Sequence, residues 1–220
     1  MKRLKRRPPR RPVRDGDTER RILDAAHVVF VRRGTAGARL QEIAAEAGVN
    51  QALLHYYFRS KERLSRAAFE RAAAQFMPAV IKVLGSEAAL EEKVARIVDL
   101  ELESLARMPY LPGYIISEIT HHPDRARQFI TAATGLEPER VGPRIAAILA
   151  RQIDDAVRRG AMRRVAPDQF IVNLMSLCIF PFAGRPMICA MLGMDQAAFE
   201  SFIARRRREL AAFFLGALRP

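Results

Sequence analysis

Residues 50–61 combine side chains that can contact the edges of DNA bases with side chains that can bind phosphate. The amides of Asn50 and Gln51 can hydrogen-bond adenine, and Ala52 is small enough to let a thymine methyl group approach. The Tyr56 hydroxyl and the Lys61 ammonium suit phosphate oxygens. These residue types in so short a stretch indicate contact with double-stranded DNA.

Two short helices around a glycine turn are expected to position these groups. From residue 40 to residue 47, apolar side chains recur at the spacing of one helix face. Gly48 can end that helix with a positive φ, and Asn50 can cap a second helix over residues 51–58. Val49, Leu54 and Phe58 should then pack inward. The side chains left exposed would be Gln51, Ala52, His55 and Tyr56.

A pair of helices joined by glycine is also common in all-helical proteins that do not bind DNA. The residue types on the second helix favour the DNA-binding interpretation. Ser60 is expected to cap another helix, and Lys61 and Arg63 would gather positive charge beside it.

Residues 18–64 resemble the DNA-binding domain of the tetracycline-repressor (TetR/AcrR) family of bacterial transcriptional regulators. About a fifth of the chain carries the resemblance, which rests on residues 22–26, 30, 33–34, 43–44, 47–50, 54–58, 60–62 and 64. The resemblance implies a dimeric, ligand-responsive regulator, in most members a repressor. The remaining residues match the family only in length and helical character.

The DNA contacts expected from the residues and the resemblance are Arg39, Gln41, Asn50, Gln51, Ala52, His55, Tyr56 and Lys61. The sequence departs from the family pattern at three places. Ala38 and Arg39 replace a usual Thr or Ser pair, so the usual N-cap of the helix after them is missing, although Arg39 could reach a phosphate. His55 stands where Tyr is common, and Leu53 where a small or polar residue is common.

The positive charge is concentrated in the first part of the chain. The formal net charge is +13, and residues 1–64 carry 16 Lys and Arg against 7 Asp and Glu. Residues 1–14 hold eight basic residues, three prolines and no acid, and we expect a disordered arm. Such an arm could follow the DNA backbone or enter a minor groove, or it could be a solvated tail with nonspecific attraction only. No apolar segment follows it, so it is not expected to be a secretory signal.

Cysteine usage predicts a reducing compartment. Cys178 and Cys189 are the only cysteines, and on one continuous helix they would lie roughly 16 Å apart, too far for a disulfide. The expected location is the cytoplasm. The apolar stretch over residues 170–184 would span about 22 Å as a helix, short of a bilayer core, and reads as buried protein.

The rest of the chain shows helical periodicity and no strand-like alternation, so the predicted fold is all-α with about nine helices. The predicted domains are a basic arm over 1–16, a three-helix helix-turn-helix domain over 17–64, and a helical effector-binding and dimerisation domain over 65–220. Within the second domain and its connecting helix, the predicted helices cover 60–84, 90–108, 114–121, a restart after Pro123 through 129, 138–160, 167–192 and 195–218.

The last predicted helix has a wide apolar stripe that suggests self-association. The predicted interface residues are Phe199, Phe202, Ile203, Leu210, Phe213 and Phe214. The alternative is that these side chains only complete an internal core. The resemblance implies a homodimer through the last two helices, which would place two recognition helices about 34–36 Å apart on a pseudo-palindromic operator.

Adaptable side chains in the second domain could surround a pocket for a small apolar effector, although each could equally be ordinary core. The candidate pocket residues are Phe76, Met77, Met108, Tyr110, Tyr114, Phe129 and Met175. The effector's identity does not follow from the sequence. No metal or cofactor is expected, because the paired His121 and His122 lack accompanying ligands at metal-binding spacing.

Catalysis is the main alternative class of function. The sequence contains no nucleophile elbow, phosphate-binding glycine loop or convergent acid pair, so we do not expect an enzyme. A second alternative is a sequence-indifferent architectural DNA-binding protein, which the basic arm would suit.

Overall fold

The computed structural model describes residues 15–220, apart from the side chains of Asp15, Ala73, Gln75 and Phe76. Over this range the regular structure is helical, which confirms the all-α prediction. The basic arm predicted over residues 1–14 lies outside the described residues. The helices are α1 (Asp15–Gly37), α2 (Leu40–Ala47), α3 (Gln51–Phe58), α4 (Lys61–Leu84), α5 (Leu90–Arg107), α6 (Leu111–His121), α7 (Asp124–Thr134), α8 (Pro138–Arg158), α9 (Pro167–Ala183), α10 (Arg185–Leu192) and α11 (Gln196–Gly216).

The predicted count of about nine helices is wrong, since the described residues form eleven. In addition, Gly34 interrupts α1 with a φ of 68°. The helix predicted over 114–121 begins earlier, at Leu111, because Pro112 is accommodated in the first turn of α6, where a helix needs no N–H donor. The single helix predicted over 167–192 is two helices, α9 and α10, bent by 71° at Gly184.

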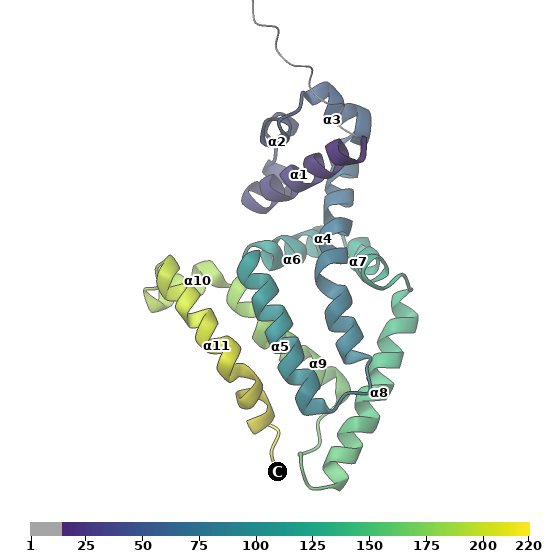
Figure 1. Ribbon diagram of the computed structural model, residues 1–220, viewed down its shortest axis with the longest axis vertical. Helices are drawn as coiled ribbons and strands as arrows, with labels where there is room; N and C mark the ends of the chain where they lie inside the picture. Colours follow the sequence, from purple (N-terminus) through teal and green to yellow (C-terminus); the bar gives the residue numbers. More distant parts are fainter. Residues whose placement is uncertain (1–14) are drawn as a thin grey trace, which may run out of the picture.

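The helices form a small domain and a larger one joined by α4 (Figure 1). The small domain holds α1, α2 and α3, and α4 leaves it to run through the larger domain without ending at Pro78. There α4 packs against α7 and α5, and α5 also packs against α9 and α11. A buried lysine on α5 links the end of α4 to α8. The Lys93 ammonium donates to the Leu84 carbonyl at the end of α4 and to the Gln152 side chain on α8, both at 2.8 Å.

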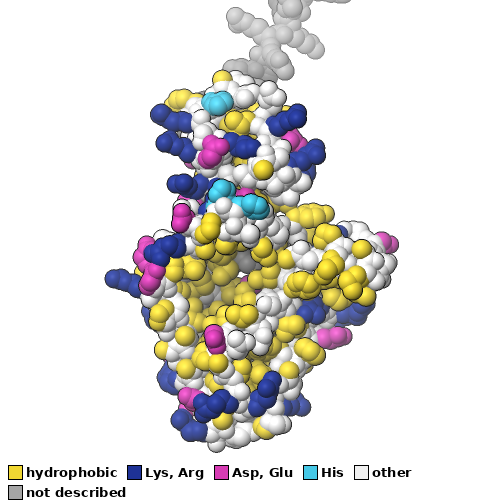
Figure 2. Space-filling model, turned by 180° about the vertical axis from the view of Figure 1, so that it is seen from behind, with side chains coloured by type: hydrophobic (Ala, Val, Ile, Leu, Met, Phe, Trp, Pro, Cys, Tyr) yellow, Lys and Arg dark blue, Asp and Glu magenta, His cyan; other side chains and the backbone are white. Residues whose placement is uncertain are grey.

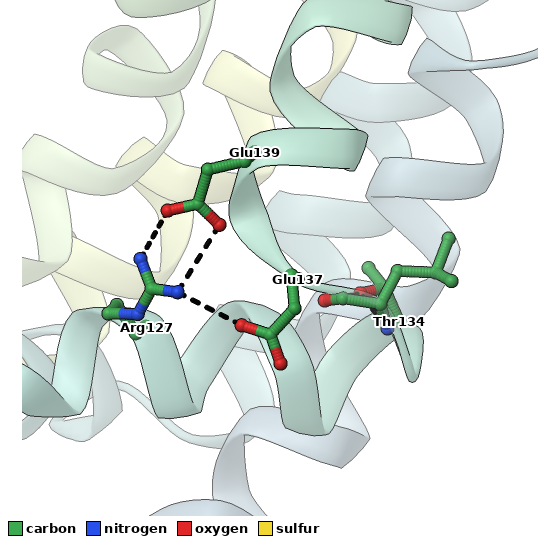
Figure 3. Close-up of polar contacts among 5 residues, drawn as sticks. Arg127, Thr134, Glu137 and Glu139 are labelled. Atoms are coloured by element: carbon green, nitrogen blue, oxygen red, sulfur yellow. Dashed lines mark hydrogen bonds and ion pairs between the residues drawn. The ribbon is translucent and has the colours of Figure 1, made fainter.

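The connection between α7 and α8 is held by an exposed ion-pair cluster (Figure 3). Arg127 on α7 pairs with Glu137, at 3.1 Å between Nη2 and Oε2, and with Glu139. The Thr134 hydroxyl closes the turn by accepting a bond from the Leu136 N–H at 3.1 Å. These contacts let α8 start in a new direction directly after α7.

The last helix divides the predicted dimer residues into a buried and an outward set. Four of the six are buried in the protomer's own core: Phe199, Ile203, Leu210 and Phe214. Phe170 and Phe182 of α9 contact this buried face through edge-to-face rings. Phe202 is half-buried, and only Phe213, 65% exposed, points fully outward. Burial of these four side chains favours the alternative of an internal core for them.

The two cysteines are free thiols. Cys178 is buried, and burial raises the pKa of its thiol to about 12. Among the described residues, no single helix is long and apolar enough to cross a bilayer, and the bent pair of α9 and α10 meets that test only when taken together. No cluster of His, Cys, Asp or Glu in the described part could hold a metal ion.

Candidate nucleic-acid interface

The turn between α2 and α3 has the geometry that its residue types require. Gly48 adopts φ 63° and ψ 38°, and its N–H bonds to carbonyls of the last turn of α2. The Asn50 side chain caps α3 by accepting a bond from the Leu53 N–H at 2.7 Å. Arg21 on α1 donates to the Ala47 carbonyl at 2.7 Å, which ties the turn to the first helix. The predicted cap and turn are therefore both present.

The outward face of α3 consists of the side chains that the sequence assigned to DNA. Leu54 and Phe58 are buried and Val49 is half-buried against the core. The exposed set comprises Gln51, Ala52, His55 and Tyr56. Tyr56 is 73% exposed, which is unusual for a large aromatic side chain with an apolar ring. An exposed face of this composition on a short capped helix can enter a major groove.

The start of α2 presents two further predicted contacts. Arg39 is exposed and occupies the N-cap position without making a side-chain capping bond, as its departure from the usual Thr or Ser predicted. Gln41, in the first turn, is also exposed. Both side chains are free of hydrogen bonds within the described part of the chain, so they are available to a phosphate or a base edge.

Lys61 has a structural role that sequence reasoning missed. Its ammonium donates to the carbonyl of Ala36 at 3.0 Å and to that of Ala38 at 3.1 Å. These two bonds tie the last turn of α1 and the segment that follows it to the first turn of α4. One ammonium N–H remains for a phosphate, so Lys61 can join the fold and the DNA backbone at the same time.

Arg59 is a cation at the interface that was not among the predicted contacts. It is exposed, follows α3 directly, and is the one non-glycine residue with positive φ in the described range, at 60°. The Ser60 N–H bonds back to the Phe58 carbonyl at 2.6 Å, so the chain makes a tight turn around Arg59. Strained backbone of this kind is found at functional sites, and the signal in the sequence was an arginine placed between two helices.

Positive side chains surround this end of the molecule. Figure 2 shows Lys and Arg side chains on both flanks of the DNA-binding domain. Two of the arginines on α1 are paired with acids of α2, Arg33 with Glu42 at 3.4 Å and Arg32 with Glu46 at 3.5 Å. These pairs offset part of the positive charge where α1 meets α2.

A buried polar cluster joins the DNA-binding domain to the larger domain. Glu118 on α6 forms an ion pair with Arg125 on α7, and both are less than 10% exposed. Thr35, at the end of α1, donates to Glu118. Ser65 on α4 accepts from Arg125 at 3.0 Å. Burial lowers the pKa of Arg125, whose guanidinium also lies 5.7 Å from the centre of the Phe69 ring. Four helices thus meet on one ion pair.

The predicted effector pocket is not assembled as expected. Tyr114 and Phe129 are buried beside this polar cluster, each in ring contact with Phe69. Met77 and Met175 are half-buried against the core, and the side chain of Phe76 lies outside the described residues.

Only Met108 and Tyr110 of the predicted set share one of the cavities described, about 340 Å³ between α1 and the start of α6. Methionine and aromatic side chains can fill a core as readily as they can line a cavity, so these residue types alone did not identify a pocket.

Comparison with known proteins identifies this architecture. The family model for bacterial regulatory proteins of the tetR family matches residues 22–68. The HTH-type transcriptional repressor NicS of Pseudomonas putida is 28% identical over 183 residues, which cover 82% of this chain and 82% of that protein. The HTH-type transcriptional repressor SCO4008 of Streptomyces coelicolor is 30% identical over 116 residues, 51% of this chain and 59% of that protein.

Two solved structures show the same fold. The ketosteroid transcriptional regulator KstR2 of Mycobacterium tuberculosis has a TM-score of 0.63 at 14% identity, covering 94% of this chain and 97% of that one. A TetR transcription regulator from Haloarcula marismortui has a TM-score of 0.57 at 20% identity, covering 92% and 98%. The family match falls on the residues that build the capped turn and the exposed α3, so residues 22–68 form a DNA-binding domain of the kind found in the tetR family of bacterial regulatory proteins.

Proposed function

We propose that this protein is a transcriptional repressor that binds a palindromic operator as a homodimer and releases it when a small molecule occupies the larger domain. The observation that carries the proposal is the outward face of α3. On this capped helix the side chains of Gln51, Ala52, His55 and Tyr56 are exposed and do not pack in the core of the protomer. The related proteins named as repressors support the direction of the regulation.

Gln51 and Ala52 stand at the start of α3, the end of a recognition helix that meets base edges. Their proposed role is to read sequence, whereas Arg39, Tyr56, Arg59 and Lys61 hold the phosphates. Phosphate contacts fix the position of the domain on the duplex and make the affinity depend on salt.

A dimer is needed because one helix of eight residues reads few base pairs. The exposed apolar side chains of α9 and α11 support a two-fold interface on these helices: Val172 and Phe180 are 55% and 52% exposed, and Phe213 is 65% exposed. Phe202 and Phe213 are eleven residues apart, about three helical turns, so both lie on one side of α11. This side lies beside the buried face of α11, about 80° around the helix axis from its centre.

Footprinting on DNA selected from a genome-wide binding map of the purified protein tests the proposal. We expect protection of one short palindrome with two half-sites about one helical turn apart. Uniform protection of unrelated DNA would instead support an architectural protein and reject the repressor.

A further inference from the structure

A groove between α5 and α11 encloses about 500 Å³ and has an apolar floor. Leu102 on α5 and Phe199 and Ile203 on α11 line it, with exposed fractions of 0%, 3% and 5%. A volume of this size lies within the range that accommodates small organic ligands. Ala106, Pro109 and Ala204 complete the apolar lining above this floor, so the groove can take up the apolar body of a small molecule.

Two of the four arginines around the groove are neutralised. Arg207 pairs with Asp99, at 2.5 Å between Nε and Oδ1, and with Glu103, at 2.9 Å between Nη2 and Oε2. Arg107 pairs with the same Glu103 at 3.1 Å. These pairs fasten α11 to α5 and leave little positive charge for a ligand.

The other two arginines, Arg185 and Arg208, have no ion-pair partner in the part of the chain that the structure describes. The Arg185 guanidinium lies 4.6 Å from the centre of the Phe199 ring and 5.5 Å from that of Tyr110, and it donates to the Gln196 side chain. Stacking and this bond orient the guanidinium but do not neutralise it. Glu200 is the remaining acid of the lining, and it accepts a bond from the amide of Gln196.

We propose that this groove binds a small amphipathic carboxylate, with the apolar body on the floor and the carboxylate on Arg185. Within the described residues only Nη2 of Arg185 is hydrogen-bonded, so its other N–H groups can donate to a carboxylate. Arg208 lies nine residues from Phe199 along α11, about 13 Å away, and adds positive charge toward the other end of the groove.

The groove lies where a bound ligand can influence other parts of the molecule. It lies along the contact between α11, a helix of the proposed dimer interface, and α5, which packs against the connecting helix α4. A ligand between α5 and α11 would therefore act on both the dimer and the link to the DNA-binding domain. This role as effector site rests on the proposed repressor function, but the binding of a carboxylate does not.

Calorimetric titration of the full-length protein with octanoate, octanol and octyltrimethylammonium tests the ligand class. We expect octanoate to bind, octanol to bind at least tenfold more weakly, and the cation not to bind. Arg185→Gln should raise the Kd for octanoate about tenfold, the loss expected for one charged hydrogen-bonding partner, and leave octanol unchanged. Arg144→Gln, an exposed arginine of α8 with no ion pair among the described residues, is the matched control.

A second variant tests the location without removing a charge. Ala204 is exposed and lines the groove, so Ala204→Leu should fold normally and fill the space, abolishing octanoate binding. Equal affinity for octanoate and octanol, or unchanged octanoate binding by either variant, would overturn the inference. Operator affinity measured on the same proteins without ligand keeps the two proposals apart, since a protein that binds its operator but not octanoate rejects only this one.

Discussion

At the scale of single residues, Gln51 is the side chain whose role in reading sequence can be measured most directly. It is exposed at the first position of α3, so Gln51→Ala should leave folding intact. We expect the substitution to weaken binding to the operator by about 1–3 kcal/mol relative to random DNA. Competition binding with operator and scrambled duplexes gives this difference. Gln169→Ala, an exposed glutamine on α9, is the control, and an unchanged preference in Gln51→Ala would remove its base-reading role.

Glu101 should make the folded protein less stable as the pH rises, which is the reverse of the usual effect of a carboxyl group in a folded protein. It is completely buried on α5, and neither carboxylate oxygen has a hydrogen-bond partner among the described residues. Burial raises its pKa from 4.5 to about 8. Between these two values the folded chain keeps a proton that the unfolded chain has lost, so stability falls as the pH rises from 4.5 to about 8 and then levels off.

Glu101→Gln should remove this dependence, because the amide has no proton to release near neutral pH. Compared with the unsubstituted protein, we expect the free energy of unfolding of the variant to be higher by on the order of 4 kcal/mol at pH 8 and by much less at pH 5. These figures count only the ionisation of Glu101 and not the cost of burying the amide. Urea unfolding at the two pH values measures it. A gain of equal size at both would show that ionisation is not the cause. Glu103→Gln, a half-exposed carboxylate on the same helix, is the comparison.

At the scale of elements, the helix-turn-helix was predicted to the residue, whereas several roles in the larger domain were not. The signals at Gly48, Asn50 and Ser60 are local: each residue carries out its turn or cap within its own segment. The buried charges of Lys93 and Glu118 depend on carbonyls and cations from distant helices, which no periodicity reveals. The pattern of α11 was apolar on more than one side, so spacing alone could not say which side faces the core.

Lys61 and Arg63 separate the structural and electrostatic roles of the first turn of α4. Lys61→Ala should lower the free energy of unfolding by about 1 kcal/mol, because the bonds to carbonyls at the end of α1 and just after it are lost, and should weaken binding to all DNA. Arg63→Ala removes an exposed cation without an ion pair in the described range and should weaken DNA binding only. In each variant the slope of log affinity against log salt should fall by about 1. Equal stability of the two variants would contradict the structural role of Lys61.

The Glu118–Arg125 pair should couple the two domains energetically. Glu118→Gln leaves a buried guanidinium without its counter-charge, and we expect it to lose about 3–5 kcal/mol of unfolding free energy. The double variant Glu118→Leu with Arg125→Met removes both charges and should recover most of that loss. A double-mutant cycle by urea unfolding measures the coupling, and additive losses would show that the pair does not act as a unit.

At the scale of the whole molecule, the proposal depends on two DNA-binding domains held at a fixed separation. The arrangement in Figure 1 puts α3 and the end of α11 at opposite ends of the protomer, so the dimer helices can set that separation only through the larger domain and α4. A change anywhere along this path would alter the spacing of the recognition helices without touching their base contacts. Repression can therefore be lost while each domain still binds DNA on its own.

Phe213→Asp tests this dependence. The side chain is 65% exposed, so the substitution should leave the protomer folded, while it places a charge in the proposed interface of α9 and α11. We expect monomers in sedimentation equilibrium and operator affinity at least a hundredfold weaker, because the second half-site then binds as a separate event. Affinity for a single half-site should not change. Leu136→Asp, at a 45% exposed apolar residue between α7 and α8, should remain dimeric, and a dimeric Phe213→Asp would place the interface elsewhere.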